Sequence, residues 1–589
     1  MSTIKLFTGL VSLFLALGQV ASLSGSLNST YYNPILPGWH SDPSCTQVDG
    51  TFFCVTSTFI SFPGLPIYAS KDLTDWKLIS HAWNRDSQLP GASWNTTGQQ
   101  QGMYAATIRH HDSVFYVICE YLMDAGNLGV VFSAADPFDD GAWSDPVIFH
   151  PTSIDPDLFW DDDGKVYAAL QGITLHELDL ETGELSEPGV SIWNGTGGVW
   201  PEGPHIYKKD GWYYLMIAEG GTELDHSITI ARSRKITGPY EAYAGNPILT
   251  NRGTQEYFQT VGHGDLFQNA DGNWWGVSLA TRSGPDWEVY PMGRETVLFP
   301  VTWEEGDWPV LQPVRGKMSG WTLPPTSRAL AGNGPFNSDP DVYDFETDTA
   351  IPRNLVHWRV PREGAFSTTA KGLQIVPSRN NLTGTPLSEE TIELSGQRGL
   401  AFIGRRQTDT LFTFSVDLSF NPEAVGQEAG VTVFLTQVNH IDLGVVLLPA
   451  RCSKGKKRGP ANQLSFRFRA EGTGTPPAPN IVPVPTGWAD GPIRLEIQTV
   501  NATHYSLAVM PASNPNAKLI VGSASAGLVS GGNGSFVGSL VGAYATCNGA
   551  GTGLDCPEGG NAYFKRWRYA GAAQYISETE LIPEVAYSS

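Results

Sequence analysis

KDGWYYLMIAEG, residues 209–220, consists of an Asp-Gly turn followed by an aromatic and apolar strand. An Asp-Gly step between two strands is one of the strongest short signals for a β-hairpin, because both residues tolerate the positive φ that a tight turn needs. The pattern recurs four times in the first half of the chain: VDGTFFCVTST (48–58), HDSVFYVICEY (111–121, with Asp-Ser), DDGKVYAALQG (162–172) and ADGNWWGVSLAT (270–281). The intervals of roughly 50 to 60 residues suit a four-stranded unit with variable outer loops.

Five such units predict a five-bladed β-propeller. The alternative is a β-sandwich with chance hairpins, but a sandwich does not require one hairpin to recur at regular intervals. The composition agrees with short strands and frequent turns, since the chain has 65 Gly, 41 Pro and 11% aromatic residues. With 589 residues it is too long for one ordinary core, so we expect an all-β protein of two domains.

Each turn fixes a register along the strand that precedes it. Seven or eight residues before the turn aspartate, all five units carry a side chain capable of chemistry. The innermost strand of a blade precedes its first hairpin, so these side chains should meet at one end of the central channel. Taken alone, each of these residues could be a turn former, a packing residue or a core histidine. Because all five occupy nearly the same position relative to their turns, together they indicate a functional site. The five are Asp42, Tyr104, Asp155, Glu202 and His263.

Three carboxyl groups around one cavity predict an acid–base site. Like charges in a partly dry site raise at least one pKa, which leaves one carboxylic acid beside a carboxylate. Hydrolysis of a glycosidic bond requires such a pair. Metal-assisted hydrolysis is the alternative, but the ring has too few histidines for a zinc site, and we expect no metal cofactor.

The charge of the chain narrows the class of partner. A formal net charge of −22 argues against nucleic acid or an anionic membrane surface as the main partner, whereas a neutral ligand is compatible with it. Indole faces stack on the C–H faces of sugars, so the 18 tryptophans are consistent with a sugar ligand, although most tryptophan in any protein is buried.

The N-terminus has the plan of a secretory signal peptide over residues 1–22, with Lys5, an apolar run and small residues that place cleavage near Ala21. An uncleaved anchor is the alternative, but the run is short for a membrane span. We therefore expect a secreted, extracellular protein. Six Asn-x-Ser/Thr sequons agree with this: Asn28, Asn95, Asn194, Asn381, Asn501 and Asn533.

Cysteine positions also indicate an oxidising compartment. In CTQVDGTFFC (45–54) a two-residue turn at the Asp-Gly step places Cys45 opposite Cys54, close enough to form a disulfide. Cys119 lies in an apolar strand and is expected to be a buried thiol. The three remaining cysteines should supply a second bridge, most simply Cys547 to Cys556, with Cys452 left over.

Several longer segments occur in an order and spacing that resemble glycoside hydrolase family 43, of the fungal β-xylosidase and α-L-arabinofuranosidase type. The likeness runs from about Tyr32 to about Trp321. The segments are NPILPGWHSDPS (33–44), STFISFPGLPIYASKDLTDWKLI (57–79), SIDPDLFWDDDGKVY (153–167), PEGPHIYKKDGWYYL (201–215), TVGHGDLF (260–267) and PMGRETVLFPVTWEEGDWP (291–309).

The resemblance implies an inverting hydrolase on a five-bladed propeller. It makes Asp42 the general base that activates water, Glu202 the general acid, and Asp155 the carboxylate that raises the pKa of the acid and orients it. An inverting mechanism places the Asp42 and Glu202 carboxyls about 6.5 to 9.5 Å apart, and a separation of about 5 Å would mean retention.

The same resemblance assigns the surrounding residues. His263 lies near the acid and the glycone, Arg294 reaches toward substrate hydroxyls, and Phe59 walls the glycone subsite. Tyr104-Ala105-Ala106 stands where the family usually has Trp-Ala-Pro, which preserves stacking and changes the width of the pocket. Some family members hold a calcium or sodium ion in the channel near the histidine, and the sequence neither demands nor excludes one.

The second half of the chain is expected to form another domain. Alternating strands such as LFTFSVDLSF (411–420) predict a β-sandwich, and the segment resembles the concanavalin-like (lectin-like) C-terminal domain of family 43 xylosidases, which narrows the pocket from the side. We expect the propeller over 25–325, a Pro-rich linker over 326–338 and the sandwich over 339–575. The basic cluster over 451–458 is interpreted as a solvated loop, with contact to an acidic polymer as the alternative.

The sequence therefore predicts a secreted exo-glycosidase that removes terminal β-D-xylose or α-L-arabinofuranose from the hemicellulose of plant cell walls. Debranching of arabinoxylan by an α-L-arabinofuranosidase and endo-arabinanase activity are alternatives within the family. A sugar-binding propeller without turnover is an alternative of another class. An invertase-like fructosidase is disfavoured, because its Asn-Asp-Pro-Asn motif is absent around Asp42.

Overall fold

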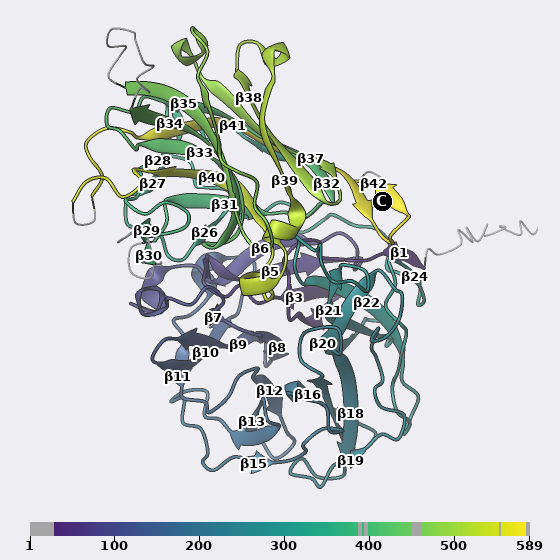
Figure 1. Cartoon of the computed structure of the whole chain (residues 1–589). Helices are drawn as coiled ribbons and strands as arrows, with labels where there is room; N and C mark the ends of the chain where they lie inside the picture. Colours follow the sequence, from purple (N-terminus) through teal and green to yellow (C-terminus); the bar gives the residue numbers. More distant parts are fainter. Residues whose placement is uncertain (1–28, 387–391, 394–398, 450–461, 553–554, 585–589) are drawn as a thin grey trace, which may run out of the picture.

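The computed structural model describes residues 29–386, 392–393, 399–449, 462–552 and 555–584. The expected signal peptide, the basic cluster 451–458 and Cys452 lie outside the described residues. Within the described ranges, no helix has the length and apolar character needed to cross a membrane. Strands dominate both halves of the chain, and the green-to-yellow C-terminal half lies on one side of the purple-to-teal N-terminal half (Figure 1).

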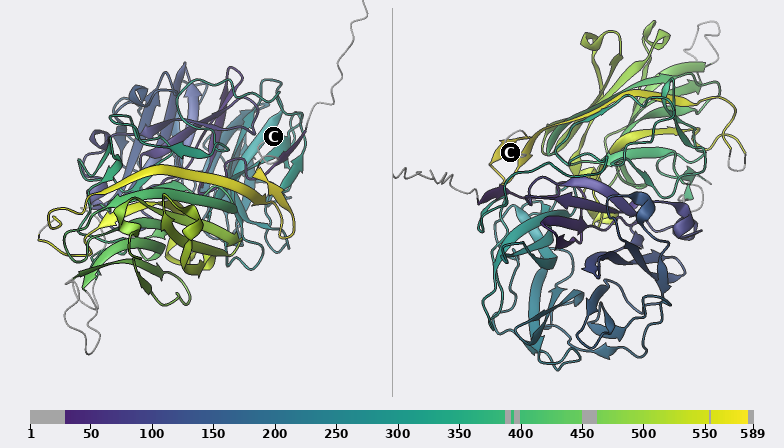
Figure 2. Two further views of the ribbon diagram at one scale, coloured as in Figure 1. Left: turned by 90° about the horizontal axis from the view of Figure 1, so that it is seen from above. Right: turned by 180° about the vertical axis from the view of Figure 1, so that it is seen from behind.

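The N-terminal half is a ring of five antiparallel sheets, which confirms the predicted five-bladed propeller (Figures 1 and 2). From inner to outer strand, blade 1 is β2 (Ser44–Val48), β3 (Thr51–Val55), β5 (Gly64–Ser70) and β6 (Lys77–Trp83); blade 2 is β8 (Thr107–His111), β9 (Val114–Met123), β10 (Gly126–Ala134) and β11 (Val147–Phe149), with β7 (Gly102–Met103) also paired to β9; blade 3 is β12 (Asp157–Trp160), β13 (Val166–Leu170), β14 (Thr174–Glu177) and β15 (Val190–Ser191); blade 4 is β16 (Glu202–Lys209), β17 (Trp212–Glu219), β18 (Ser227–Ser233) and β19 (Glu241–Ala242); blade 5 is β20 (Phe258–Gln268), β21 (Trp274–Arg282), β22 (Glu295–Thr302) and β23 (Val310–Leu311).

The five repeat hairpins are not identical. In blades 1, 2 and 4 the turn has two residues, both left-handed, as at Asp210 (φ 53°) and Gly211 (φ 72°). In blades 3 and 5 five residues separate the paired strand ends, and of the Asp-Gly pair only Gly164 and Gly272 have positive φ. Loop length does not set the register counted from the aspartate, because that count is seven residues in blade 1 and eight in the other four blades, whichever turn they have.

The N-terminal segment ties itself to the last blade of the ring. β1 (Thr30–Tyr32) pairs with β24 (Lys317–Ser319). The Asn33 side-chain amide donates to the Leu298 carbonyl at 3.0 Å and accepts from the Leu298 N–H at 2.8 Å. These bonds join the first described residues to β22 of blade 5 and hold the ring closed.

The C-terminal half is a sandwich of two sheets, as expected for a concanavalin-like domain. In strand order, one sheet is β27 (Phe366–Thr369), β28 (Gly372–Ile375), β41 (Ala562–Tyr575), β32 (Leu411–Phe420), β37 (Ile493–Asn501), β38 (His504–Pro511) and β39 (Leu519–Ser525), with β25 (Asp341–Tyr343) and β42 (Leu581–Pro583) paired to β41; the other is β36 (Asn480–Pro483), β35 (Asn462–Glu471), β34 (Asn439–Pro449), β33 (Glu428–Thr436), β40 (Leu540–Thr546), β31 (Phe402–Arg406), β26 (Val356–Trp358) and β4 (Ser61–Phe62).

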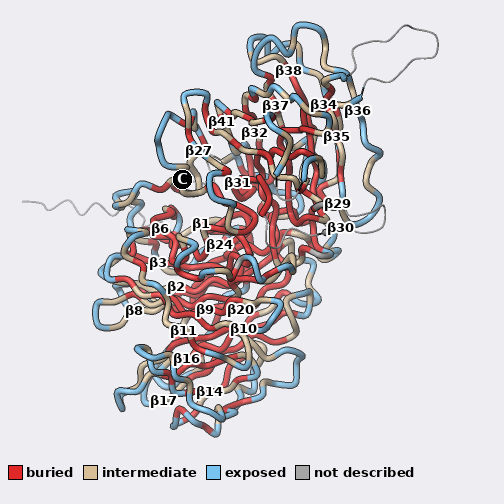
Figure 3. Tube along the Cα trace, turned by 90° about the vertical axis from the view of Figure 1, so that its left-hand side faces the viewer, coloured by how far each residue is buried: buried red, intermediate tan, exposed pale blue. Residues whose placement is uncertain are grey.

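The two domains share an apolar core and a sheet. β4 belongs to the propeller half of the chain, yet it pairs with β26 of the sandwich. Trp39, Phe59 and Ile60 are buried in the same apolar cluster as the sandwich core, and buried backbone (red) continues across the junction (Figure 3). The sandwich is therefore fixed against the propeller beside blade 1, where β4 lies between β3 and β5 along the chain (Figure 1).

Both expected disulfides are present. Cys45 pairs opposite Cys54 across the β2–β3 hairpin and is bonded to it, and Cys547 is bonded to Cys556. Cys119 is a buried free thiol in β9, as predicted.

Candidate active site

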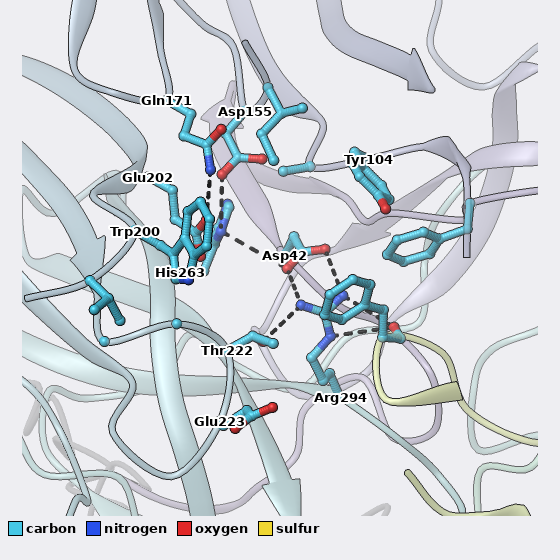
Figure 4. A pocket seen from close by; sticks show the side chains of 17 residues that line it. Asp42, Tyr104, Asp155, Gln171, Trp200, Glu202, Thr222, Glu223, His263 and Arg294 are labelled. Carbon is cyan, nitrogen blue, oxygen red and sulfur yellow. Dashed lines mark hydrogen bonds and ion pairs between the residues drawn. The ribbon is translucent and has the colours of Figure 1, made fainter. Parts of the chain in front are cut away.

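All of the expected site residues line one cavity of about 490 Å³. The structure places Asp42, Asp155 and Tyr104 two or three residues before an inner strand, Glu202 at the first residue of β16, and His263 inside β20 beside a register shift. Phe59 and Arg294 complete the predicted set. Figure 4 shows Asp42 in the middle of the group, with Glu202 and Gln171 on one side and Arg294 on the other.

An unusual backbone conformation aims several of these side chains at the cavity. Asp42 (φ 52°), Asp155 (φ 59°) and His263 (φ 47°) are all left-handed, and so is Gly203 (φ 56°), next to Glu202. Non-glycine residues seldom adopt positive φ, and where they do the surrounding structure must hold them there. Three equivalent positions in three blades share this conformation, which turns the start of each inner strand toward the axis.

Asp42 is held in its charged form. Arg294 Nη1 lies 3.0 Å from Asp42 Oδ1, Nη2 lies 3.4 Å from Oδ2, and the Ser57 hydroxyl donates to Oδ2 at 2.6 Å. Burial alone would raise the pKa of Asp42, but the Arg294 guanidinium and the Ser57 hydroxyl bring it below its usual range. At neutral pH this side chain is a carboxylate paired with a guanidinium.

Glu202 is held in the opposite state. Burial raises the pKa of Glu202 to about 7, and the charge of Asp42 acts in the same direction. Gln171 Nε2 donates to Glu202 Oε2 at 3.2 Å, and this bond favours the charged form, so it partly opposes the rise. Glu202 therefore keeps its proton up to about neutral pH, in the same cavity as a charged aspartate.

Asp155 is coupled to Glu202. The Gly203 N–H donates to Asp155 Oδ2 at 3.0 Å, so the aspartate contacts the backbone directly after Glu202. Burial, followed by the charges of Glu202 and Asp42, raises the pKa of Asp155 well above its usual range. Because each of the two groups disfavours the charge of the other, Asp155 and Glu202 do not both ionise readily.

His263 lies between the aspartates. Its Nδ1 is 4.0 Å from Asp42 Oδ1 and 3.9 Å from Asp155 Oδ2. Burial lowers the pKa of His263 to about 4, so the imidazole is neutral at neutral pH. Both carboxyls lie within 4.0 Å of one nitrogen, so their oxygens are separated by no more than twice that distance.

The sandwich supplies one wall of the cavity. The Phe536 carbonyl accepts hydrogen bonds from Arg294 Nε at 3.3 Å and from Nη2 at 3.1 Å, and the Phe536 N–H donates to Gln100 Oε1 at 2.6 Å. The Phe536 ring stacks on Phe59, with centroids 6.2 Å apart, and meets Tyr104 edge-on at 6.4 Å. The arginine that pairs with Asp42 is thus positioned by both domains.

Comparison with known proteins identifies the family of this chain. The non-reducing end α-L-arabinofuranosidase of Bacteroides ovatus is 35% identical over 529 residues, which cover 88% of this chain and 92% of that protein. The model for glycosyl hydrolases family 43 matches residues 31–309. The chain belongs to glycosyl hydrolase family 43. The model for the β-xylosidase C-terminal concanavalin A-like domain matches residues 342–570 of this family 43 chain.

Other family 43 proteins align over most of the chain. The xylosidase/arabinosidase of Butyrivibrio fibrisolvens is 34% identical over 438 residues, 70% of this chain and 79% of that protein. The crystal structure of the xylan β-1,4-xylosidase of Bacillus halodurans superposes with a TM-score of 0.76 at 26% identity, covering 92% of this chain and all of that one. The resemblance found in the sequence motifs is therefore confirmed, and the protein is a glycoside hydrolase.

Several lining residues were not predicted from the sequence. Trp200 stands at the rim, with 66% of its surface exposed, and Thr222 Oγ1 accepts from Arg294 Nη1 at 3.0 Å. Gln171 could have been found, because it directly follows β13 in the third repeat. Phe536 carries no such signal, since it belongs to GGNGSF (531–536), far along the chain in another domain.

Replacing Phe536 with alanine should raise KM and lower kcat/KM by roughly tenfold to 10²-fold, because the pocket loses the wall that positions the sugar. The backbone carbonyl that binds Arg294 remains, so the melting temperature should change little. Steady-state kinetics would measure the effect. Val342→Ala, at a side chain of the sandwich that is 61% exposed, serves as the control and should match the parent. Equal kinetics for Phe536→Ala and the parent would contradict a role for this wall.

Proposed function

We propose that the protein is an inverting exo-glycosidase that removes a terminal pentose, β-D-xylose or α-L-arabinofuranose, from xylan or arabinoxylan oligosaccharides. One observation carries the proposal: Arg294 holds Asp42 as a carboxylate, while burial holds Glu202 as an acid in the same cavity. Binding a neutral sugar without turnover would need no such pair, which argues against a purely sugar-binding propeller.

The proposed reaction is a single displacement. Glu202 gives its proton to the glycosidic oxygen as the bond from that oxygen to the anomeric carbon breaks. A water attacks the opposite face of the sugar, and Asp42 accepts the proton that the water loses. Asp155 acts through Glu202, since it accepts a hydrogen bond from the adjacent Gly203 N–H, and the two carboxyl groups do not both ionise readily. At the end Asp42 holds a proton and Glu202 has lost one, so proton exchange with solvent restores the enzyme.

The cavity and the relatives support the substrate class. A volume of about 490 Å³ with Phe536 as one wall suits the end of a chain better than its middle, which disfavours endo-arabinanase activity. The exposed Trp200 at the rim offers a face for the next sugar unit. The relatives are named as xylosidases and arabinofuranosidases, so both pentoses belong to the proposal.

Secretion is part of the proposal. The leader-like segment 1–22 supports it. Asn95, Asn194 and Asn501 lie in sequons and are exposed, as acceptors of N-linked glycans must be.

A substrate panel tests the function. Xylobiose, arabinoxylan with single or double branches, and linear arabinan are offered to the protein, and proton NMR follows the anomer that is released. Release of a single pentose with inverted configuration supports the proposal. Retained configuration, or oligomers cut from the middle of arabinan, would refute the inverting or the exo assignment respectively.

The pH profile of kcat/KM should show activity over a wide acidic range, with its upper limit near neutral pH. Activity requires Asp42 without its proton and Glu202 with its proton, so kcat/KM should fall as pH rises past about 7, the pKa of Glu202. On the acid side activity should persist to a pH below the usual pKa of an aspartate, about 3.9, because the pKa of Asp42 is lowered. Gln171→Leu removes a bond that favours the charged form of Glu202, so the alkaline limb should move to higher pH. A shift of the alkaline limb to lower pH in Gln171→Leu would contradict this prediction. So would an equal shift in Gln268→Leu, the control at an exposed glutamine.

A further inference from the structure

A second polar layer lies directly behind the catalytic ring, the name we give to the five site residues Asp42, Tyr104, Asp155, Glu202 and His263. In three blades it is two residues further along the chain: Ser44 after Asp42, Asp157 after Asp155, and Asp265 after His263. Alternate residues of a strand face the same side, so these side chains also turn toward the axis. Blade 2 contributes Arg109 and blade 4 contributes His205, so every blade supplies one member.

The members of this layer, which we call the axial cluster (Ser44, Arg109, Asp157, His205 and Asp265), are joined through the guanidinium. Arg109 Nη1 lies 2.7 Å from Asp265 Oδ2, and Nη2 lies 2.8 Å from Asp157 Oδ1. Nη2 also lies 3.0 Å from His205 Nδ1, and Nη1 lies 3.2 Å from the Ser44 hydroxyl, which donates to Asp265 Oδ2 at 2.6 Å. One cationic side chain therefore contacts the other four blades.

The charges of the axial cluster explain why a cation is needed at this position. Asp157 and Asp265 are 1% and 0% exposed, and two buried carboxylates on one axis are strongly destabilising unless a cation lies between them. A bound metal ion could meet this need, and oxygen ligands of this kind suit calcium or sodium. Here the guanidinium already contacts both carboxylates. Within the part of the chain that the structure describes, no three His, Cys, Asp or Glu side chains converge to hold a metal.

We propose that the Arg109 guanidinium is the built-in structural cation of the propeller axis, standing where a metal ion would otherwise neutralise Asp157 and Asp265. The residues of the axis therefore do not fit a resident calcium or sodium ion. The inference does not depend on which glycoside the enzyme cleaves. The axial cluster also affects the catalytic ring, because His205 and Asp265 both influence the pKa of His263.

The first experiment uses the unmodified protein. After exhaustive dialysis against potassium EDTA in a sodium-free buffer, its melting temperature and its activity on an aryl pentoside should stay the same, and added calcium or sodium should not raise either. A fall in melting temperature on dialysis that calcium or sodium reverses would overturn the proposal.

The second experiment removes the cation. Arg109→Met keeps much of the side-chain volume and removes the guanidinium from two buried carboxylates, so the melting temperature should fall by about 10 °C. Calcium should recover a large part of the loss, because the Asp157 and Asp265 carboxylates and the Ser44 hydroxyl become available as oxygen ligands. If the folded variant does not respond to calcium, the guanidinium does not occupy a cation position and the proposal is wrong.

A matched control separates this effect from a general effect of calcium. Arg282 pairs with Glu295 in another buried ion pair of the propeller, with Arg282 Nε 2.6 Å from Glu295 Oε2, but that pair has a single carboxylate and lies outside the axial cluster. Arg282→Met should lose stability without recovery by calcium. An equal calcium response in both variants contradicts the proposal. If Arg109→Met fails to fold, Arg109→Lys takes its place: its compact ammonium should give a smaller loss and a weaker calcium response.

Discussion

Glu202→Ala is expected to lose about 10³–10⁴-fold in kcat on xylobiose and far less on a nitrophenyl pentoside. The sugar leaving group is a poor anion and needs a proton as its bond breaks, whereas nitrophenolate leaves without one. Steady-state kinetics on both substrates measure the difference. The alkaline limb near pH 7 should also vanish from the aryl-glycoside profile, because that limb belongs to Glu202.

Two further variants make the Glu202 experiment decisive. Glu202→Gln keeps the shape and the contact with Gln171 but has no acidic proton, so it should show the same selective loss as Glu202→Ala. Glu181→Ala, at an exposed carboxylate of blade 3, should behave as the parent. An equal loss on both substrates would mean that Glu202 is not the acid, and full activity of Glu202→Gln on xylobiose would mean the same.

The catalytic ring could be predicted because a tight turn fixes the phase of the strand before it. A hairpin leaves little freedom in register, so counting back from Asp49 or Asp210 reaches the start of the inner strand. Counting back from the turn aspartate also reaches the inner strand in blades 3 and 5, because the strand ends joined by their five-residue loops remain paired. The left-handed backbone of Asp42, Asp155 and His263 could not be predicted, since asparagine and aspartate at positive φ are usually turn formers.

Side chains that enter the cavity from the other domain could not be predicted from the sequence. Phe536 arrives through a contact between residues more than four hundred positions apart, and local patterns carry no information about such pairs. The axial cluster is an intermediate case. Asp157 and Asp265 follow the ring register by two residues, but Arg109 stands elsewhere along its strand and reaches them with a long side chain. The strand register counted from the turns predicts the position of the backbone, but it does not predict which distant groups a long arginine side chain contacts.

The contacts between the domains connect the candidate active site to the sandwich. Arg294 is bound on one side by Asp42 of the propeller and on the other by the Phe536 carbonyl, and the Phe536 N–H is in turn bound by Gln100. The state of the proposed base therefore depends on a guanidinium that two domains position together. This dependence makes Asp42 the residue whose loss should have the broadest effect.

Asp42→Ala should lose about 10²–10⁴-fold in kcat on every substrate, aryl pentosides included, because activation of water is needed whatever the leaving group. The change also leaves the buried Arg294 without its carboxylate, which costs about 3–5 kcal/mol when a buried pair is broken. Unfolding must therefore be separated from lost chemistry. Asp42→Asn keeps a side chain of the same shape against Ser57 and Arg294, so the two variants are compared by melting temperature and by kcat together.

Azide provides the positive test of the Asp42 assignment. In Asp42→Ala the space beside Arg294 is open to a small anion, and azide attacks carbon without a general base, so it should restore part of the activity on an aryl pentoside that has a good leaving group. The product should be a glycosyl azide whose anomeric configuration is opposite to that of the substrate, since the attack comes from the face that water normally uses. Rescue with retained configuration, or full activity of Asp42→Asn without azide, would exclude Asp42 as the base of an inverting reaction.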